Sequence, residues 1–381
     1  MTELTLTNAR IVLPDTVIHG TVHVRDGRIA DVSEGRASRN ALDMEGDTLV
    51  PGLVELHTDH VETHLSPRPG VRWDPTLAVV AHDAQIAGSG ITTVFDALCI
   101  GMDEDRSERT GAMEMRGLLH ATRAIQDAGL LRAEHFTHLR CEVAAPDVLT
   151  DWAAFEGEPS VRLVSLMDHT PGQRQFTSLQ AHRLYYQGKG GMNDVEYDAF
   201  VTERRERAML YSDRHRRAIA AAARSRALPV ASHDDATPAH VEEAVRDGVV
   251  LAEFPTTLEA AEASRAAGIA VLMGAPNVVR GQSHSGNVAA LDLARAGALD
   301  ILSSDYVPYA LMQAAFAIPA RLDNWDLPRA IRTVTKTPAE VIGLHDRGAI
   351  EPGRRADLVR VRIHDERPIV REVWREGRRV S

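Results

Sequence analysis

A histidine and an aspartate, separated by one residue, follow a mostly apolar run near position 50. His57 and Asp59 come directly after residues 49–56. Because residues i and i+2 of a β-strand face the same side, an imidazole and a carboxylate would emerge there together. Both are ligand types that suit a catalytic zinc, manganese or iron ion. Taken alone, the pair is equally compatible with a polar strand end that faces water.

Four further residues of ligand type each end a strand-like run downstream: Glu142, His169, His233 and Asp305. A single acidic strand end is more often a capping or ion-pairing group, and a single buried histidine is usually a hydrogen-bonded core residue. Six candidates at the same end of five strands argue against that explanation for the whole set. We therefore expect one or two divalent metal ions, zinc in the first place, with manganese, iron and magnesium as alternatives.

Such a site would activate water. A divalent ion, or a pair about 3.5–4 Å apart, lowers the pKa of a bound water molecule toward neutrality. Asp305 could both contact the metal and accept a proton from that water. Lys189 and Lys336 are the only lysines, and neither ends a strand-like run, so a carboxylated lysine is not expected to bridge two ions. Glu142 is the best-placed carboxylate for that bridging role.

The segments between the strands carry basic and amide groups that suit an anionic substrate. Arg174 and Gln175 are neighbours in one loop, Lys189 lies in a glycine-rich segment, and Arg280 precedes His284 in another loop. Guanidinium groups and glycine-rich backbone bind phosphate oxygens well. Any one of these arginines is more simply explained as an ordinary surface residue. Only the basic and amide residues taken together favour an anionic substrate. His284 could protonate a leaving oxygen, although a solvated loop histidine is an equally good explanation.

Strand-like and helix-like patterns alternate through the middle of the chain. The candidate strands are 53–60, 91–98, 136–143, 161–169, 228–234, 251–256, 270–276 and 300–306, and the clearest helices are 75–88, 194–226 and 257–267. Most of these strands are continuous apolar runs, as in parallel strands buried on both faces. Because polar residues end so many of them, we expect a (β/α)8 TIM-like barrel rather than an open doubly wound sheet or a distorted barrel.

Both ends of the chain are rich in β-strand patterns. Residues 4–46 and 355–380 read as short strands with tight turns, which predicts one small β-sandwich domain built from the two termini. The expected division is 1–50 and 346–381 for the small domain and 51–345 for the metal-dependent barrel.

The composition of the chain indicates its cellular compartment and the classes of partner that it does not bind. The net charge of −11 over 381 residues argues against a nucleic-acid-binding surface. The two cysteines, Cys99 and Cys141, lie in apolar runs, which indicates a reducing compartment and no disulfide framework. Neither a signal peptide nor a membrane-spanning stretch is expected, so we predict a cytoplasmic protein that does not bind membranes. We also expect a homo-oligomer, in the form of a dimer.

Three stretches resemble the amidohydrolase superfamily: residues 50–57 at the start of the barrel, 303–305 near its end, and 353–359 in the return to the small domain. More narrowly, the chain resembles a diphosphatase branch of that superfamily. The stretches that carry this resemblance are 55–59, 163–169, 171–176, 186–189, 231–237, 252–257, 273–277, Arg280 and 283–290. The resemblance extends over nearly the whole chain. Asp59 departs from it, because many members of the superfamily have a second histidine there.

The resemblance implies hydrolysis of a ribose 5-triphosphate that bears an anomeric methylphosphonate, as in phosphonate degradation by the carbon–phosphorus lyase pathway. Pyrophosphate would leave and the 5-phosphate would remain. Arg174, Lys189 and Arg280 would neutralise the departing pyrophosphate, with Gln175 and Asn277 also binding the substrate. Two alternatives stay open at this point: a deaminase or cyclic amidase acting on a small C–N substrate, and a catalytically inactive interaction subunit.

Overall fold

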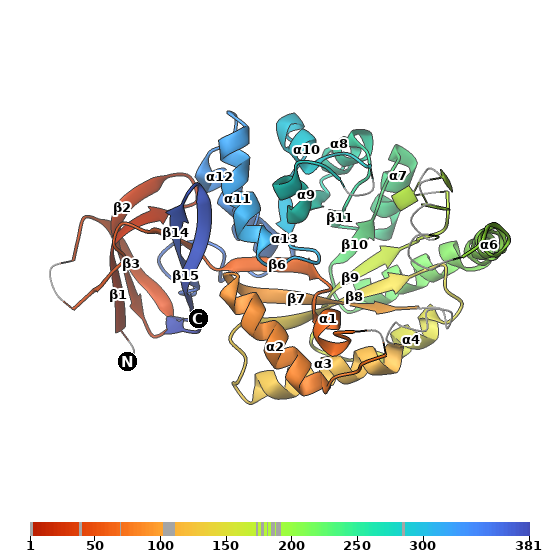
Figure 1. Ribbon diagram of the computed structural model, residues 1–381, viewed down its shortest axis with the longest axis horizontal. Coiled ribbons are helices and arrows are strands. Elements are labelled where there is room, and N and C mark those ends of the chain that lie inside the picture. The colour runs from red at the N-terminus through yellow and green to blue at the C-terminus, as the bar shows by residue number, and fades with distance from the viewer. Residues whose placement is uncertain are drawn as a thin grey trace.

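Eight parallel strands form the centre of the computed structural model (Figure 1). The structure describes residues 3–37, 40–68, 70–101, 111–172, 174–176, 179–180, 182–183, 187, 192–283 and 286–381. The strands are β6 (Leu53–Thr58), β7 (Ile91–Ile100), β8 (Glu134–Glu142), β9 (Val161–Met167), β10 (Val230–His233), β11 (Leu251–Glu253), β12 (Ala270–Gly274) and β13 (Ile301–Ser303). They are hydrogen-bonded in sequence order from β6 to β13, so all eight predicted strands are confirmed.

The barrel closes where β13 returns to β6. The backbone N–H of Asp305 donates to the carbonyl oxygen of His57 at 3.1 Å. Below this bond, the buried carboxylate of Glu55 accepts hydrogen bonds from the N–H of His57 at 2.7 Å and from the N–H of Ser304 at 2.5 Å. This side chain therefore replaces part of the missing strand ladder. The closure confirms the barrel and brings the first and last predicted ligand strands together.

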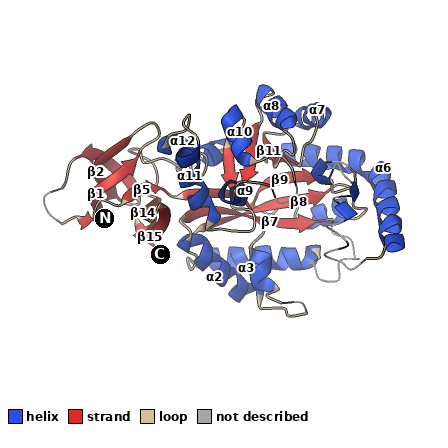
Figure 2. Ribbon diagram, turned by 45° about the horizontal axis from the view of Figure 1, so that its top comes forward, coloured by secondary structure: helices blue, strands red, loops and turns tan. Residues whose placement is uncertain are grey.

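Helices surround the strands on the outside (Figure 2). They are α1 (Val61–Leu65), α2 (Pro75–Gly88), α3 (Ala112–Asp127), α4 (Val148–Ala154), α6 (Asp194–Ser225), α7 (Pro238–Asp247), α8 (Leu258–Ala266), α9 (Ala275–Arg280), α10 (Ala290–Ala296), α11 (Ala310–Arg321), α12 (Leu327–Arg332) and α13 (Lys336–Val341). Local sequence explains two of the predicted starts. Asp74 caps α2 by accepting from the N–H of Leu77, and Asn193 forms a capping box with Glu196 at α6. The predicted helices agree with α2, α6 and α8 to within about a residue.

Seven of the eight barrel strands end one to three residues earlier than expected, and three of these ends share a left-handed turn beside the pocket. The predicted strands 228–234, 251–256 and 300–306 stop at residues 233, 253 and 303. The left-handed backbone of Asp234, Phe254 and Asp305, with φ of 56°, 53° and 55°, interrupts the extended conformation there. These turns direct the side chains that follow each strand toward the barrel axis instead of continuing the strand.

The remaining strands form a second sheet from both termini. They are β1 (Glu3–Val12), β2 (Val17–Arg25), β3 (Arg28–Glu34), β4 (Leu42–Asp43), β5 (Thr48–Pro51), β14 (Leu358–His364), β15 (Arg367–Arg375) and β16 (Arg378–Arg379). The main path runs β16-β15-β14-β5-β1-β2-β3, with β4 paired to β1. Antiparallel pairing of β5 with β14 joins the two ends of the chain, as the sequence predicts. The exact division at residues 50 and 345 stays a prediction.

Apolar side chains fill the lower part of the barrel and leave its carboxyl end for polar groups. Leu56, Phe95, Leu163, Leu251 and Ile301 are buried in one cluster inside the strands. Active sites of such barrels lie at the carboxyl ends of the strands, above this packed layer. Among the described helices, we find none with both the length and the apolar character that a membrane crossing requires.

Candidate active site

One pocket opens at the carboxyl ends of the barrel strands. Its cavity volume is about 210 Å³, and its mouth is open to solvent. Its walls include residues from β6, β8, β10 and the segments after β9, β11, β12 and β13. The polar residues on these walls include His57, Asp59, Arg140, His169, Gln175, His233, Asp234, Asn277, Arg280 and Asp305.

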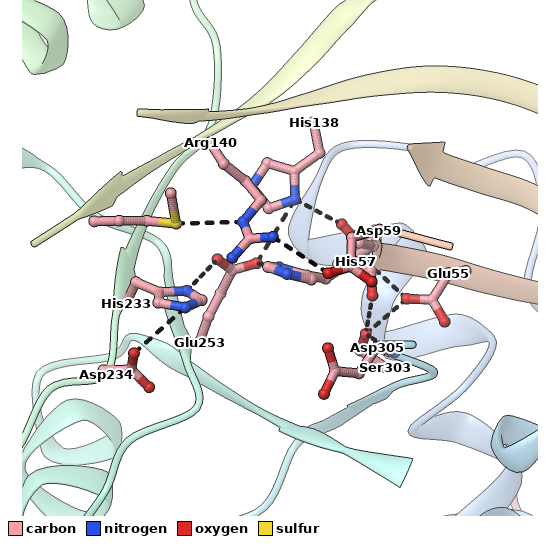
Figure 3. A network of polar contacts seen from close by, with 12 residues as sticks. Glu55, His57, Asp59, His138, Arg140, His233, Asp234, Glu253, Ser303 and Asp305 are labelled. Atoms are coloured by element: carbon pink, nitrogen blue, oxygen red, sulfur yellow. Dashed lines mark hydrogen bonds and ion pairs between the residues drawn. The ribbon is translucent and has the colours of Figure 1, made fainter. Parts of the chain in front are cut away.

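Two histidines of the pocket share one carboxylate beneath them (Figure 3). Nδ1 of His57 lies 3.0 Å from Oε1 of Glu253, and Nδ1 of His233 lies 3.3 Å from Oε2 of the same residue. The two imidazoles are stacked, with ring centroids 5.6 Å apart. All three side chains are buried. Glu253 thus occupies the Nδ1 atoms and leaves the Nε2 atoms for partners in the pocket.

A third histidine of the pocket is held by the carboxylate that ends β8. Nδ1 of His169 lies 2.6 Å from Oε2 of Glu142, and the N–H of His169 donates to Oε1 at 3.1 Å. Nε2 of His169 lies 3.8 Å from Oδ2 of Asp234, and Nε2 of His233 lies 3.5 Å from the same oxygen. Among the described residues, that buried oxygen has no hydrogen-bond partner.

Burial and crowding shift the ionisation of the carboxylates in the pocket. Burial, followed by repulsion from the charge of Asp59, raises the pKa of Asp305 to about 8. Burial also raises the pKa of Asp234 to about 7 and lowers the pKa of His233 to about 3. The carboxylates of the pocket are therefore shielded from water, and the imidazoles beside them are neutral. The described residues of the pocket do not supply enough positive charge to balance the carboxylates.

These groups fit a divalent cation. Ligand atoms of His57, His233 and Glu253 lie within 4.8 Å of one another, and those of His169, His233 and Asp234 do so as well. Imidazole nitrogens together with carboxylate oxygens suit zinc and similar divalent ions. The unpartnered oxygen of Asp234 is the kind of buried acceptor that such an ion would satisfy.

An arginine enters the same site from the wall of the barrel. Arg140, on β8, lines the pocket, and its Nη1 lies 3.7 Å from Oδ2 of Asp59. Its Nε donates to Sδ of Met167 at 3.3 Å. Figure 3 shows its guanidinium between His138 and His233, pointing toward the buried carboxylates. The site therefore combines groups that suit a metal with a fixed cation that could bind a phosphoryl oxygen.

The structure brings most of the predicted residues together. His57, Asp59, His169, His233 and Asp305 all line the pocket, together with Gln175, Asn277 and Arg280. The strand count also agrees with expectation, because His169 follows the fourth strand of the barrel and His233 ends the fifth. Lys189 and His284 lie outside the described residues.

Two of the predicted residues have other positions. Arg174 is 4% exposed and not on the pocket wall; its Nη1 donates to Oδ1 of Asp235 at 2.6 Å, and its Nη2 pairs with Glu243. Its guanidinium therefore belongs to a buried ion-pair cluster, which corrects the expectation that it binds substrate. Glu142 also lies behind the pocket wall, with both oxygens bonded to His169. In this structure Glu142 orients a histidine. Its role as a metal ligand or bridging carboxylate stays a prediction.

Sequence reasoning missed Glu253, Asp234, His138 and Arg140. Glu253 ends its strand, but the expected strand continued to residue 256 and hid that position. His138 and Arg140 alternate with Glu142 along β8, so the period of two already predicted that all three share one face. A search for same-face polar residues within strands, and not only at their ends, would have found them.

Sequence comparisons agree with this architecture. A model of the amidohydrolase family matches residues 205–380. Alpha-D-ribose 1-methylphosphonate 5-triphosphate diphosphatase from Escherichia coli is 46% identical over 377 residues, covering 98% of this chain and 99% of that protein. Imidazolonepropionase from Deinococcus deserti is 27% identical over 396 residues, covering 94% and 91%. The chain therefore belongs to the amidohydrolase family.

Solved structures show the same fold at low sequence identity. A 5-methylcytosine deaminase from Klebsiella pneumoniae aligns with a TM-score of 0.65 and 16% identity over 99% of this chain and 98% of that one. N-isopropylammelide isopropylaminohydrolase from Burkholderia multivorans aligns with a TM-score of 0.61 and 18% identity, covering 100% and 98%. Both match the barrel and the terminal sheet together.

Proposed function

We propose that this protein hydrolyses alpha-D-ribose 1-methylphosphonate 5-triphosphate to the 5-phosphate and pyrophosphate in phosphonate degradation. One observation carries the proposal: a single pocket holds a histidine–carboxylate group suited to a divalent ion and two arginines, Arg140 and Arg280. Water-activating groups serve many hydrolases of this family, whereas guanidinium groups on the pocket wall favour a phosphorylated substrate. The near full-length similarity to a diphosphatase supports the same reaction.

The pocket residues would divide the work between holding a cation and moving a proton. We assign the cation, one or two ions with zinc first, to His57, Asp59, His169, His233 and Asp305. Asp234 joins this set because its unpartnered oxygen faces two of the histidines. When bound, a divalent ion would lower the pKa of water and polarise a phosphoryl oxygen.

The chain's own groups account for the rest of the reaction. The carboxylate of Asp305 would take a proton from the attacking water, whose oxygen forms a bond to the α-phosphorus. The bond between the α-phosphorus and the bridging oxygen breaks, and pyrophosphate leaves with the electron pair. Arg140 and Arg280 would stabilise the negative charge on the phosphoryl oxygens, and Gln175 and Asn277 would bind the remaining polar groups.

Pyrophosphate release from the ribose triphosphate tests the proposal. We expect turnover with this substrate by the purified protein, loss of turnover after chelation, and recovery when zinc or manganese is returned. A parallel assay with imidazolonepropionate and 5-methylcytosine tests C–N hydrolysis on the same preparation. Turnover of a C–N substrate, with no pyrophosphate from the triphosphate, would replace the diphosphatase by the rival function. A cytoplasmic dimer remains our prediction for the assembly.

A further inference from the structure

We propose that Glu253 is a positioning residue that fixes His57 and His233 in the tautomer with the proton on Nδ1. Each imidazole would then present the lone pair of Nε2 to the pocket. The inference rests on the cation site within the proposed function, and it is independent of which substrate the pocket binds.

The hydrogen-bond geometry carries this proposal. The carboxylate of Glu253 is fully buried, and its two oxygens lie 3.0 Å and 3.3 Å from Nδ1 of His57 and of His233 respectively. An ionised carboxylate only accepts hydrogen bonds, so both imidazoles must donate through Nδ1. A neutral imidazole that donates through one nitrogen has its lone pair on the other. One side chain thus sets the proton position on two rings.

The nearest third imidazole does not compete for this carboxylate. Nδ1 of His138 lies 3.8 Å from Oε1 of Glu253, but it donates instead to the carbonyl oxygen of Leu56 at 2.9 Å. Each oxygen of Glu253 therefore has one imidazole N–H at hydrogen-bond distance. This one-to-one match indicates that Glu253 acts on His57 and His233 specifically, and is not merely a negative charge near several histidines.

The next residue along the chain fixes the planes of the same two rings. The ring of Phe254 packs edge to face against His57 and His233, with centroid distances of 5.0 Å and 5.3 Å. Its side chain reaches them because the backbone of Phe254 is left-handed, with φ of 53°. In a continuing strand, residue 254 would face away from residue 253. The early end of β11 thus places an acceptor and an aromatic wall on the same two histidines.

A glutamine at this position would break the symmetry. In Glu253→Gln, the amide oxygen can accept from one Nδ1–H, while the NH₂ group opposes the other. The second imidazole would have to move its proton to Nε2, which removes one lone pair from the pocket. Loss of a carboxylate that orients a metal-binding histidine lowers metal affinity by roughly 10–100-fold.

Long-range proton–nitrogen NMR of the metal-free protein tests the tautomers directly. We expect His57 and His233 as Nδ1–H tautomers in the unmodified protein, and a switch of one of them in Glu253→Gln. Zinc affinity, measured by competition with a chelator, should fall by roughly 10–100-fold in that variant. The matched control is Glu134→Gln, because Glu134 is a partly buried carboxylate of the same barrel that pairs with Arg347 and Arg355. It should leave both tautomers and the zinc affinity unchanged.

Several results would overturn the proposal. Unchanged tautomers in Glu253→Gln together with unchanged zinc affinity would remove the positioning role. Unchanged tautomers with one fewer zinc bound per chain would make Glu253 a direct ligand instead. If Glu253→Gln does not fold, Glu253→Asp is the second variant, because it keeps both oxygens but withdraws them by one methylene. Loss of an Nδ1–H tautomer together with weaker zinc binding would support the proposal, and unchanged tautomers with unchanged zinc affinity would overturn it. None of these measurements uses a substrate, so a failure of the diphosphatase assay leaves them valid.

Discussion

Replacing Asp305 by asparagine should abolish most of the turnover and yet stabilise the metal-free protein. Asp305 is buried near Asp59 and Asp234, and these surroundings raise its pKa to about 8 from a usual value of 3.8. The folded state therefore binds a proton that the unfolded state has released at pH 7. With 1.36 kcal/mol for each pKa unit, holding this proton from pH 3.8 to pH 7 costs up to about 4 kcal/mol.

The sign of this effect follows from proton linkage. Because the folded-state pKa is raised, the metal-free protein loses stability as pH rises from about 4 to about 8. Asparagine cannot ionise, so Asp305→Asn lacks this loss. At pH 7 the free energy of unfolding of the variant should exceed that of the unmodified protein by up to about 4 kcal/mol. Near pH 4 the difference should be much smaller, because a protonated aspartate and an asparagine are both neutral when buried.

Urea unfolding of chelated protein at several pH values measures this difference. Titrating groups far from Asp305 contribute equally to both proteins, so subtracting the two curves leaves the contribution of Asp305 together with that of its neighbours Asp59 and Asp234. Pyrophosphate release should fall by about 10²–10⁴-fold, as expected when a general base is lost. The burial argument would be refuted if the stability difference between Asp305→Asn and the unmodified protein were the same at pH 7 as at pH 4. Near-normal turnover would separately remove Asp305 from the proposed proton transfer.

Three further changes test other parts of the molecule. Arg140→Met should lower kcat/KM for the triphosphate by about 10²-fold while zinc content stays constant, as steady-state kinetics with metal analysis would show. Arg174→Ala should cost about 3–5 kcal/mol in urea unfolding, because buried Asp235 loses its ion-pair partner and keeps, among the described side chains, only the hydroxyl of Ser232. Turnover per folded molecule should persist. Asp96→Asn should cost a similar amount, since Asp96 lies 2.8 Å from nitrogens of both His82 and His135. The contacts with Asp96 and Asp83 outweigh burial and raise the pKa of His135 to about 9. The protonated imidazole should therefore stabilise the fold fully below about pH 6.5, and this contribution should be lost as pH rises through 9. Urea unfolding at pH 7 and at pH 10 would detect the loss.

The sequence was sufficient to predict the barrel and the set of strand ends, because both follow from short-range patterns. Apolar runs identify buried parallel strands, and a polar residue after each run identifies the carboxyl end. Arg174 shows the limit of this reasoning. Its position in a loop suggested a substrate contact, but its ion pair joins it to Asp235, 61 residues away in the sequence. Without knowledge of which distant carboxylates surround it, a loop arginine cannot be assigned to solvent, substrate or core.

Glu253 shows a different limit, which concerns strand length. The apolar and β-branched residues around it predict a strand to residue 256, yet Phe254 turns the chain at a left-handed angle. Phenylalanine has no intrinsic preference for that conformation, so tertiary contacts must impose it. The N–H of Phe254 donates to the carbonyl oxygen of Leu272 at 2.8 Å, and its ring packs on His57 and His233. Such a turn depends on partners that only the closed barrel supplies.

The closure of the barrel and the geometry of the site depend on the same side chains. Glu55 receives the N–H groups of His57 and Ser304, so one carboxylate joins β6 to β13 directly beneath two proposed ligands, His57 and Asp305. Any widening of this seam would separate the imidazole from the carboxylate that must share its cation. Glu253 imposes a similar constraint between β6 and β10 through its two histidines. A buried carboxylate is costly when it has no partner. Glu55 and Glu253 are nevertheless present where strands must be held in register around a cation. The stability of the barrel is therefore linked to the occupancy of its cation site.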